Sequence, residues 1–377
     1  VDENLRIYPQ EKVVKLSYKK NTKIKIGFLS ADIKDAHSVT YFLKTVLKNY
    51  NQDEFEIILF TNQIKEDNTS EEIASLVFET INVGKINDLE AFNIIRQHNL
   101  DIMIDIMGYT SRNRIEFYKN RIAKKQVIWM GYCNTSGLKN MDYIISDPNL
   151  IHSGEEKYYI EKILYLPEIW NCHCGFDFER KENLPPFIKN NYITFGSFNN
   201  PAKINENVID CWSNILKKNK GSKLIIKCAN KKRKLYRIQE AFKKSGVIDS
   251  VIFYRKIDNL MDHLNLYKKI DIALDTFPYN GVTTSFEAIW MGVPVLTMAG
   301  YNFNSRCGES INKNLNMEYL IAKDEKEYVS KAVSLSNDRD KFLNIRKSLF
   351  LNAIKSPLFD EKKFSENFFS SLREIIK

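Results

Sequence analysis

The residues most suited to chemistry lie in a short polar stretch, NGVTTSFE, a few residues after Asp275. The apolar run before Asp275, the turn-forming loop, the helical pattern that begins after Thr284 and a second apolar run predict a βαβ unit. The first N–H groups of a helix have no partner within it and lie at the positive end of its dipole, so they favour a phosphate. Glu287 lies one turn into this helix, where its carboxylate is expected to accept hydrogen bonds from ribose hydroxyls.

A structural interpretation of the same residues stays open. Thr283 and Thr284 are also ordinary helix N-cap residues, and a cap needs no ligand. The loop has neither the GxGxxG pattern nor the GxxxxGK[ST] pattern, so neither a dinucleotide site nor a kinase-type site is predicted.

The elements that position these residues are predicted from apolar runs that alternate with helical-period segments. Such alternation is typical of parallel sheets covered by helices. The predicted strands form one group at residues 24–29, 55–60, 102–106, 126–129, 143–145 and 163–166, and a second at 192–198, 223–228, 251–254, 272–274 and 293–298. The predicted helices lie at residues 39–50, 87–98, 205–218, 234–244 and 258–269.

The sequence therefore predicts an α/β protein of two Rossmann-like domains with a cleft at the carboxyl ends of their strands. We expect the first domain at residues 1–175, a linker at 176–191 around a Pro-Pro pair, and the second domain at 192–355. A terminal helix is predicted at residues 356–377.

The amino-acid composition indicates which class of protein this is. The chain has 377 residues, of which 44% are hydrophobic and 27% charged, as in soluble globular proteins. No apolar run reaches the roughly 18–20 residues that span a bilayer, and the first residues lack the apolar region of a signal peptide. No membrane partner is therefore expected.

Cysteine usage and charge suggest a location and partners. The six cysteines do not form a disulfide framework, which favours reduced thiols and a cytoplasmic location. Cys172, His173 and Cys174 form a cluster, but no second pair completes four zinc ligands. The net charge of +9 would suit nucleic acid or acidic partners, yet Lys and Asn are abundant throughout, so solvated helix faces are the preferred explanation and no nucleic-acid partner is expected.

Five stretches resemble, in order, the catalytic region of the O-linked N-acetylglucosamine transferases and SPINDLY-related proteins of glycosyltransferase family 41. They are IGFLSADIKDAHSVTYFL (26–43), DIMIDIMGYTSRNR (101–114), VIWMGYCNTSGLKNMDYIISD (127–147), FGSFNNPAKI (195–204) and the segment 275–300. The resemblance implies a GT-B fold, in which two Rossmann-like domains face each other and the last helix crosses back to the first domain.

The resemblance also implies roles for residues of the second domain. Lys203 matches the family lysine that contacts the donor phosphates, with Asn200 beside it, and His263 matches a histidine that contacts the nucleotide. Asn280 and Gly281 belong to the donor loop, while Val282 stands where animal members have a histidine. Because the phosphates would be neutralised by a lysine and a helix end, no metal cofactor is expected, and the UDP-sugar is a co-substrate.

In the first domain the resemblance places His37 near the sugar and the acceptor, and the backbone at Gly131 against the donor sugar and phosphates. Tyr109 and Gly131 follow predicted strands that face the same cleft, and ordinary turns stay open as the alternative for both. An inverting transfer needs a base within reach of the acceptor hydroxyl. His37 is the first candidate, although one additional residue separates it from Asp32, and Asp101 is the second, unless it merely begins a strand.

The sequence thus predicts an inverting, metal-independent transferase that moves a sugar, GlcNAc from UDP-GlcNAc, to Ser or Thr hydroxyls of a protein. GDP-fucose or UDP-glucose as the donor, transfer to asparagine, and a nucleotide-sugar-binding module without activity stay open as alternatives. Relatives carry tetratricopeptide repeats upstream. If such repeats precede Val1 in the full chain, they are expected to choose the acceptor protein.

Overall fold

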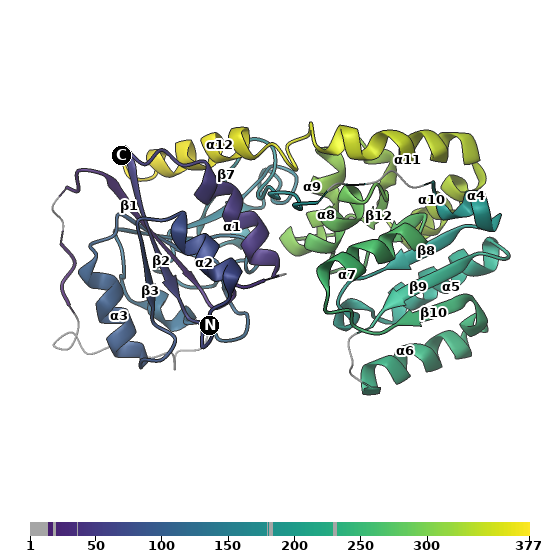
Figure 1. Ribbon diagram of the computed structural model, residues 1–377, viewed down its shortest axis with the longest axis horizontal. Coiled ribbons are helices and arrows are strands. Elements are labelled where there is room, and N and C mark those ends of the chain that lie inside the picture. The colour runs from purple at the N-terminus through teal and green to yellow at the C-terminus, as the bar shows by residue number, and fades with distance from the viewer. Residues whose placement is uncertain (1–13, 18–19, 36, 179, 181–183, 229–231) are drawn as a thin grey trace. The chain divides into compact units, whose positions relative to one another are not determined.

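The computed structural model describes residues 14–17, 20–35, 37–178, 180, 184–228 and 232–377. The chain divides into two compact units (Figure 1). Unit 1 comprises Val1–Cys174 with Asp360–Lys377, and unit 2 comprises Gly175–Phe359.

Unit 1 contains, in its described part, a seven-stranded sheet with the order β3-β2-β1-β4-β5-β6-β7. All neighbouring strands are parallel, with Ile26 of β1 between Ile57 of β2 and Ile102 of β4. The strands are β1 (Ile24–Ser30), β2 (Phe55–Thr61), β3 (Glu79–Asn82), β4 (Ile102–Asp105), β5 (Lys125–Ile128), β6 (Tyr143–Ser146) and β7 (Lys162–Tyr165). The α-helices are α1 (Ser38–Lys48), α2 (Asn68–Ser75), α3 (Asp88–Gln97) and α12 (Glu361–Glu374), and short 3₁₀ helices lie at Ile115–Lys119 and Glu156–Tyr158.

Unit 2 contains, among its described residues, a six-stranded parallel sheet with the order β10-β9-β8-β11-β12-β13. The strands are β8 (Thr194–Ser197), β9 (Lys223–Lys227), β10 (Val251–Tyr254), β11 (Ile272–Leu274), β12 (Val295–Met298) and β13 (Ile321–Ala322). The α-helices are α4 (Pro186–Asn190), α5 (Glu206–Lys218), α6 (Lys232–Lys244), α7 (Leu260–Leu266), α8 (Thr283–Trp290), α9 (Cys307–Lys313), α10 (Glu325–Asn337) and α11 (Arg339–Ala353). Short 3₁₀ helices lie at Pro201–Lys203, Ile248–Ser250, Tyr267–Lys269, Phe303–Ser305 and Glu318–Leu320.

Helix α5 shows why the sequence produces such elements. Asn205 caps its first turn by accepting a hydrogen bond of 3.0 Å from the N–H of Val208. Helix α5 contacts α6 and α10. Its buried side chains recur at helical spacing: Val208, Ile209, Cys211, Trp212, Ile215 and Leu216.

The strand order creates a reversal point in each unit. In unit 2 the chain runs outward from β8 through β9 to β10 and then returns to β11 on the other side of β8. The loops that follow β8 and β11 therefore leave the sheet in opposite directions, and ligands of open α/β sheets bind at such a point. In unit 1 the same reversal lies between β1 and β4.

The C-terminal helix α12 belongs to unit 1, as the predicted return to the first domain requires. The ring of Phe368 lies 4.7 Å from that of Trp129, and Phe369 lies 4.8 Å from Phe55, measured between centroids. The hydroxyl of Ser365 donates to the carbonyl of Thr45 at 3.1 Å.

The segment predicted as a linker, 176–191, is assigned to unit 2, and its residues Pro186–Asn190 form helix α4. The buried carboxylate of Asp271 accepts the N–H groups of Phe187 (3.1 Å) and Thr194 (2.8 Å), so it ties α4 to the first strand of the sheet. Residues 179 and 181–183 of this segment lie outside the described residues, as do residues 1–13 of the predicted first domain.

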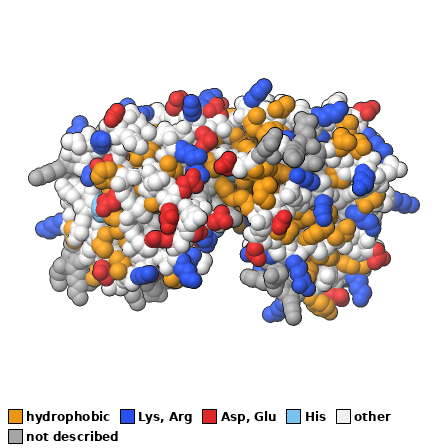
Figure 2. Space-filling model, in the orientation of Figure 1, with side chains coloured by type: hydrophobic (Ala, Val, Ile, Leu, Met, Phe, Trp, Pro, Cys, Tyr) orange, Lys and Arg blue, Asp and Glu red, His pale blue; other side chains and the backbone are white. Residues whose placement is uncertain are grey.

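Charged side chains of both signs are spread over the face shown in Figure 2, and Lys and Arg are not gathered into one patch there. Among the described residues, no helix is both long and apolar enough to cross a bilayer.

Candidate functional site

Asp275, the residue that follows β11, organises the loop that leads to α8. Its Oδ1 atom accepts hydrogen bonds from the backbone N–H groups of Gly281 (2.7 Å) and Thr276 (2.8 Å) and from the amide of Asn199 (3.0 Å). Its Oδ2 atom accepts the hydroxyl of Thr297 at 2.7 Å. Burial raises the pKa of this carboxyl above its usual range, although these donors and the charge of Lys203 act in the opposite direction.

Asn199 and Gly281 bring the β8 loop against the start of α8. The hydroxyl of Thr284 donates to Oδ1 of Asn199 at 2.5 Å, while the Asn199 amide group holds Asp275. A Cβ atom on Gly281 would lie only 2.5 Å from Oδ1 of Asn199 and 2.6 Å from the Thr284 hydroxyl. A glycine is therefore required for this close approach.

The amino end of α8 has no side-chain cap. Its N-cap residue is Val282, and the helix itself begins at Thr283. Thr283 and Thr284 are therefore the first two residues of the helix and not its N-caps. Among the described residues, no hydrogen-bond acceptor is recorded for the backbone N–H groups of Thr283 and Thr284. Orphan N–H groups at a helix start are suited to an anion.

Lys203 brings a positive charge to the same loop. It ends the 3₁₀ helix after β8, and its Nζ donates to the carbonyl of Asn280 at 2.6 Å. The ammonium also lies 3.9 Å from the centroid of the Tyr279 ring, a cation–π contact. The predicted phosphate-binding lysine and the predicted phosphate-binding helix end are thus brought together.

Asn280 and Asn200, also predicted to contact the ligand, both make hydrogen bonds within the protein. The Asn280 side chain is buried, donates to the carbonyl of Thr276 at 2.9 Å and accepts the N–H of Gly308 at 3.2 Å, so it holds the loop together. Asn200 is exposed and caps the 3₁₀ helix by accepting the N–H of Ala202 at 3.0 Å.

Glu287 lies in a buried polar cluster with His263 and Tyr267. Nε2 of His263 is 2.9 Å and the hydroxyl of Tyr267 is 2.8 Å from Oε2 of Glu287. Burial acts to raise the pKa of Glu287, but the hydrogen bond from His263, the charge of Lys227 and the hydrogen bond from the Tyr267 hydroxyl together lower it below the usual value. The carboxylate is therefore ionised, and among the described residues no partner is recorded for its second oxygen, Oε1.

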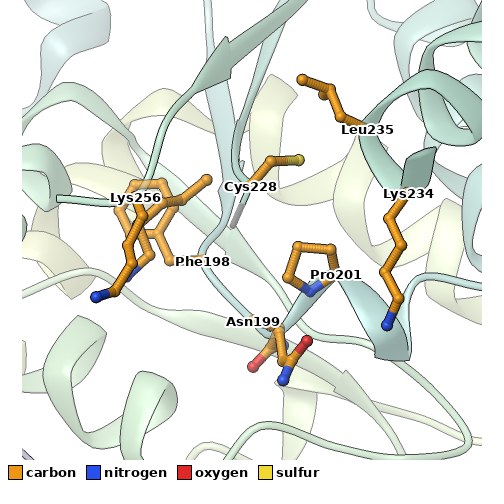
Figure 3. A pocket seen from close by; sticks show the side chains of 9 residues that line it. Phe198, Asn199, Pro201, Cys228, Lys234, Leu235 and Lys256 are labelled. Carbon is orange, nitrogen blue, oxygen red and sulfur yellow. The ribbon is translucent and has the colours of Figure 1, made fainter. Parts of the chain in front are cut away.

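A pocket of ≈ 260 Å³ adjoins this cluster (Figure 3). It lies where β8, β9 and β10 end, with Lys234 of α6 on one side and Lys256 on the opposite side in Figure 3. Its lining is Phe198, Asn199, Asn200, Pro201, Lys227, Cys228, Lys234, Leu235 and Lys256. Because lysine is its charged residue type, the pocket suits a ligand that carries negative charge.

In unit 1, His37 caps helix α1 near the end of β1. Its Nδ1 accepts the N–H of Val39 at 3.4 Å, and its Nε2 lies 3.6 Å from Oδ1 of Asp32. The same Asp32 oxygen contacts Lys34 at 3.0 Å and Arg112 at 3.7 Å. Burial is the largest cause that lowers the pKa of His37, with Lys34 and Arg112 adding to it and Asp32 opposing it.

Tyr109 and Gly131 lie at the carboxyl ends of β4 and β5. The Tyr109 hydroxyl donates to the carbonyl of Ser136 at 2.5 Å, and the side chain is half exposed. A Cβ atom on Gly131 would lie 2.1 Å from the carbonyl oxygen of Ile106, so backbone packing against β4 already requires a glycine there.

Asp101 is not brought together with the other predicted residues of unit 1. It directly precedes β4, and it accepts hydrogen bonds from Lys124 (2.7 Å) and Asn21 (2.7 Å) at the amino edge of the sheet. His37, Tyr109 and Gly131 follow strands at the carboxyl edge. This placement favours the alternative that Asp101 begins a strand and argues against a role as the base.

Sequence reasoning missed Asn199, Lys227 and Tyr267 as parts of the unit 2 site. Asn199 adjoins the predicted Asn200 and directly follows the predicted strand 192–198, and this position was the available signal. Lys227 contacts His263 through the fold alone, and no local motif marks it. Tyr267 follows His263 at helical i, i+4 spacing, and this spacing was the available signal. Among the described residues, no group of three or more His, Cys, Asp or Glu side chains could hold a metal ion.

Comparisons with known proteins identify the family of the chain. The family model described as glycosyl transferase family 41 matches residues 6–174 and 183–368. The probable UDP-N-acetylglucosamine–peptide N-acetylglucosaminyltransferase SPINDLY of Solanum lycopersicum is 31% identical over 382 residues, which cover 98% of this chain and 40% of the relative. The corresponding SEC protein of Arabidopsis thaliana is 26% identical over 362 residues, 92% of this chain and 36% of the relative. The chain thus spans less than half the length of these curated relatives.

Solved structures show the same fold. An O-GlcNAc transferase mutant from Thermobaculum terrenum superposes with a TM-score of 0.88 at 26% identity, over 94% of this chain and 68% of that one. Anabaena Alr3699/HepE, solved in complex with UDP and glucose, superposes with a TM-score of 0.57 at 13% identity, over 93% of this chain and 100% of that one, a likeness of fold alone. The two parallel sheets are thus those of a GT-B protein, and the chain belongs to glycosyltransferase family 41.

Proposed function

We propose that this chain is the catalytic region of an inverting, metal-independent transferase that moves GlcNAc from UDP-GlcNAc to Ser or Thr hydroxyls of a protein. The observation that carries the proposal is the uncapped start of α8 beside Lys203, at the reversal point of the unit 2 sheet. The SPINDLY and SEC relatives, whose names specify UDP-N-acetylglucosamine and a peptide, support this choice of donor and acceptor.

The diphosphate of the donor is expected to bind at the start of α8. The N–H groups of Thr283 and Thr284 and the positive end of the helix dipole provide donors for its oxygens. The ammonium of Lys203 provides a full positive charge at the same loop. Since charge develops on the diphosphate as it leaves, groups fixed in advance at that point stabilise the transition state. A metal ion is not needed for this neutralisation, because lysine and the helix end already provide it.

The nucleoside is expected to extend from the diphosphate towards Glu287. An ionised carboxylate with one oxygen held by His263 and Tyr267 presents its other oxygen as an acceptor. A ribose hydroxyl is a suitable donor to such an oxygen.

The transfer itself balances as a single displacement. The acceptor oxygen forms a bond to the anomeric carbon, the bond from that carbon to the diphosphate breaks, and UDP leaves with the electron pair. The hydroxyl proton passes to a base, for which we propose His37, because its lowered pKa keeps the imidazole neutral at pH 7. Nδ1 of His37 accepts the N–H of Val39 at 3.4 Å, so the proton of the neutral ring is on Nε2. Nδ1 is therefore the nitrogen that can take up the hydroxyl proton, and it does so only when this long hydrogen bond is released.

The test is calorimetric binding of UDP-GlcNAc, UDP-glucose and GDP-fucose, each with and without a chelator. We expect UDP-GlcNAc to bind in the range of about 1 µM to 1 mM, as substrates of most enzymes do, and the chelator to leave the affinity unchanged. Preference for another donor would correct the sugar, a loss of binding with the chelator would refute metal independence, and no binding of any donor would refute the proposal. Release of UDP from the bound donor, followed over time, separates an enzyme from a binding module.

A further inference from the structure

Lys227, the last residue of β9, contacts the cluster that surrounds Glu287. Its Nζ lies 3.0 Å from Nδ1 and 3.3 Å from Nε2 of His263, whose Nε2 lies 2.9 Å from Oε2 of Glu287. Lys227 on β9 thus contacts His263 on α7, and His263 in turn contacts Glu287 on α8. His263, Tyr267 and Glu287 are buried, and Lys227 is partly buried.

The proton on the imidazole is located by its two neighbours. Glu287 is ionised and can only accept, so Nε2 of His263 must carry the proton that faces it. An ammonium group has only donors, and it lies nearer to Nδ1 (3.0 Å) than to Nε2 (3.3 Å), so Nδ1 is the nitrogen that accepts from Lys227 and carries no proton. The arrangement is a cation, a neutral imidazole and an anion, with no net charge.

Removal of the cation would disturb this balance. A buried carboxylate without a compensating charge is costly, and a proton taken up by the His263–Glu287 pair lowers that cost. Two other lysines line the pocket: Lys256 is ion-paired with Asp258, and Lys234 lies on the opposite side from Lys256. Among the described residues, Lys227 is the lysine that contacts His263, and Tyr267 carries no charge.

We propose that Lys227 is a positioning residue that holds His263 neutral, with its proton on Nε2, and Glu287 ionised, so that Oε1 of Glu287 accepts a ribose hydroxyl of the donor. The inference rests on the proposed function, since it needs a nucleotide at this site. It extends that function to a residue that has no predicted contact with the ligand.

The first test needs no nucleotide. Long-range ¹H–¹⁵N spectra of the histidine rings report which nitrogen carries the proton, and His263→Asn assigns the signal. We expect the Nε2-protonated form in the unchanged protein at pH 6 and pH 8. In Lys227→Met we expect a second ring proton at pH 6, and in Lys227→Arg the original spectrum.

The second test measures affinity for UDP-GlcNAc, whose phosphates do not titrate near neutral pH, at the same two pH values. Lys227→Met is expected to bind about tenfold more weakly at pH 8 and less than about threefold more weakly at pH 6, where the pair regains a positive charge. Lys227→Arg should restore the affinity. Lys243→Met removes an exposed charge from the same unit as a matched control. In a Glu287→Gln background, Lys227→Met should have no further effect.

The outcomes separate the two proposals. An unchanged ring spectrum in Lys227→Met, or a loss of affinity that is equal at both pH values and persists in the Glu287→Gln background, overturns the role of Lys227. If the ring spectra behave as expected but none of the three donors binds the unchanged protein, the proposed function is overturned instead.

Discussion

Lys203→Met separates a role in phosphate binding from a role in folding. The substitution keeps most of the side-chain length and removes the ammonium, which donates to the Asn280 carbonyl at 2.6 Å and lies 3.9 Å from the Tyr279 ring. Both contacts stabilise the loop before α8 without a ligand, so some loss of stability is expected whatever the function.

The two effects differ in size. One hydrogen bond and one partly exposed cation–π contact are each worth about 1 kcal/mol, so the loss of these two contacts should lower the free energy of unfolding by about 2 kcal/mol. A charge-assisted bond to a phosphate is worth about 1.5–3 kcal/mol, which corresponds to about a 10- to 150-fold loss of affinity for UDP. Uridine has no phosphate, so its affinity should change by less than about threefold.

The assay is calorimetry with UDP and uridine together with thermal unfolding. Lys341→Met is a matched control, because Lys341 lies on α11, away from the loop before α8. Its side chain is exposed, and its ammonium lies 5.3 Å from the centroid of the Tyr319 ring. It should lose a little stability and keep its affinity for UDP. Equal losses of UDP and uridine affinity in Lys203→Met would refute the phosphate contact, because they would show that the loop had simply lost its shape.

Three further substitutions test the structure around the site. Gly281→Ala puts a Cβ atom 2.6 Å from the Thr284 hydroxyl, so we expect donor binding to be lost and unit 2 to be destabilised by about 1–3 kcal/mol in thermal unfolding; normal binding would show that the loop adapts. Phe368→Ala empties a fully buried site on α12 and should cost about 3–5 kcal/mol, whereas exposed Glu366→Ala should cost less than about 0.5 kcal/mol; equal effects would mean that α12 does not stabilise unit 1. Burial raises the pKa of Asp105 from 3.8 to about 7, so its contribution to stability is complete below about pH 4, falls as the pH rises to about 7 and is then constant. The free energy of unfolding of Asp105→Asn, minus that of the unchanged protein, should therefore rise between pH 5 and pH 7, by at most about 1.4 kcal/mol per pH unit. Urea unfolding at each pH measures this difference, and a difference that does not change with pH would contradict the raised pKa.

Buried strands were predictable because their residues form continuous apolar runs. The bounds of β10 and β11 match the predicted ranges, and β1 differs by one residue. Strand β3 was missed because it is an edge strand whose side chains are mostly exposed, so it has no apolar run. Strand β13 has only two residues, too few for any pattern.

The site was predictable where its chemistry is local in sequence. The loop and helix start around Thr283 follow from turn residues and a change of period, and the structure puts Lys203 there. The contacts that hold the site join distant positions: Asn199 and Thr284 are 85 residues apart, and Lys227 and His263 are 36 residues apart. Pattern reasoning has no access to such pairs, because they arise only when strands pair in a particular order.

Asp101 and Asp275 show which local information decides the edge of a sheet on which a residue lies. Asp101 precedes β4 and therefore lies at the amino edge, where it pairs with Lys124. Asp275 follows β11 and lies at the carboxyl edge, where it orders the loop before α8. Both aspartates adjoin an apolar run, and only their order relative to that run differs. Since all strands of a parallel sheet point the same way, this order alone excludes Asp101 from the edge at which His37 lies.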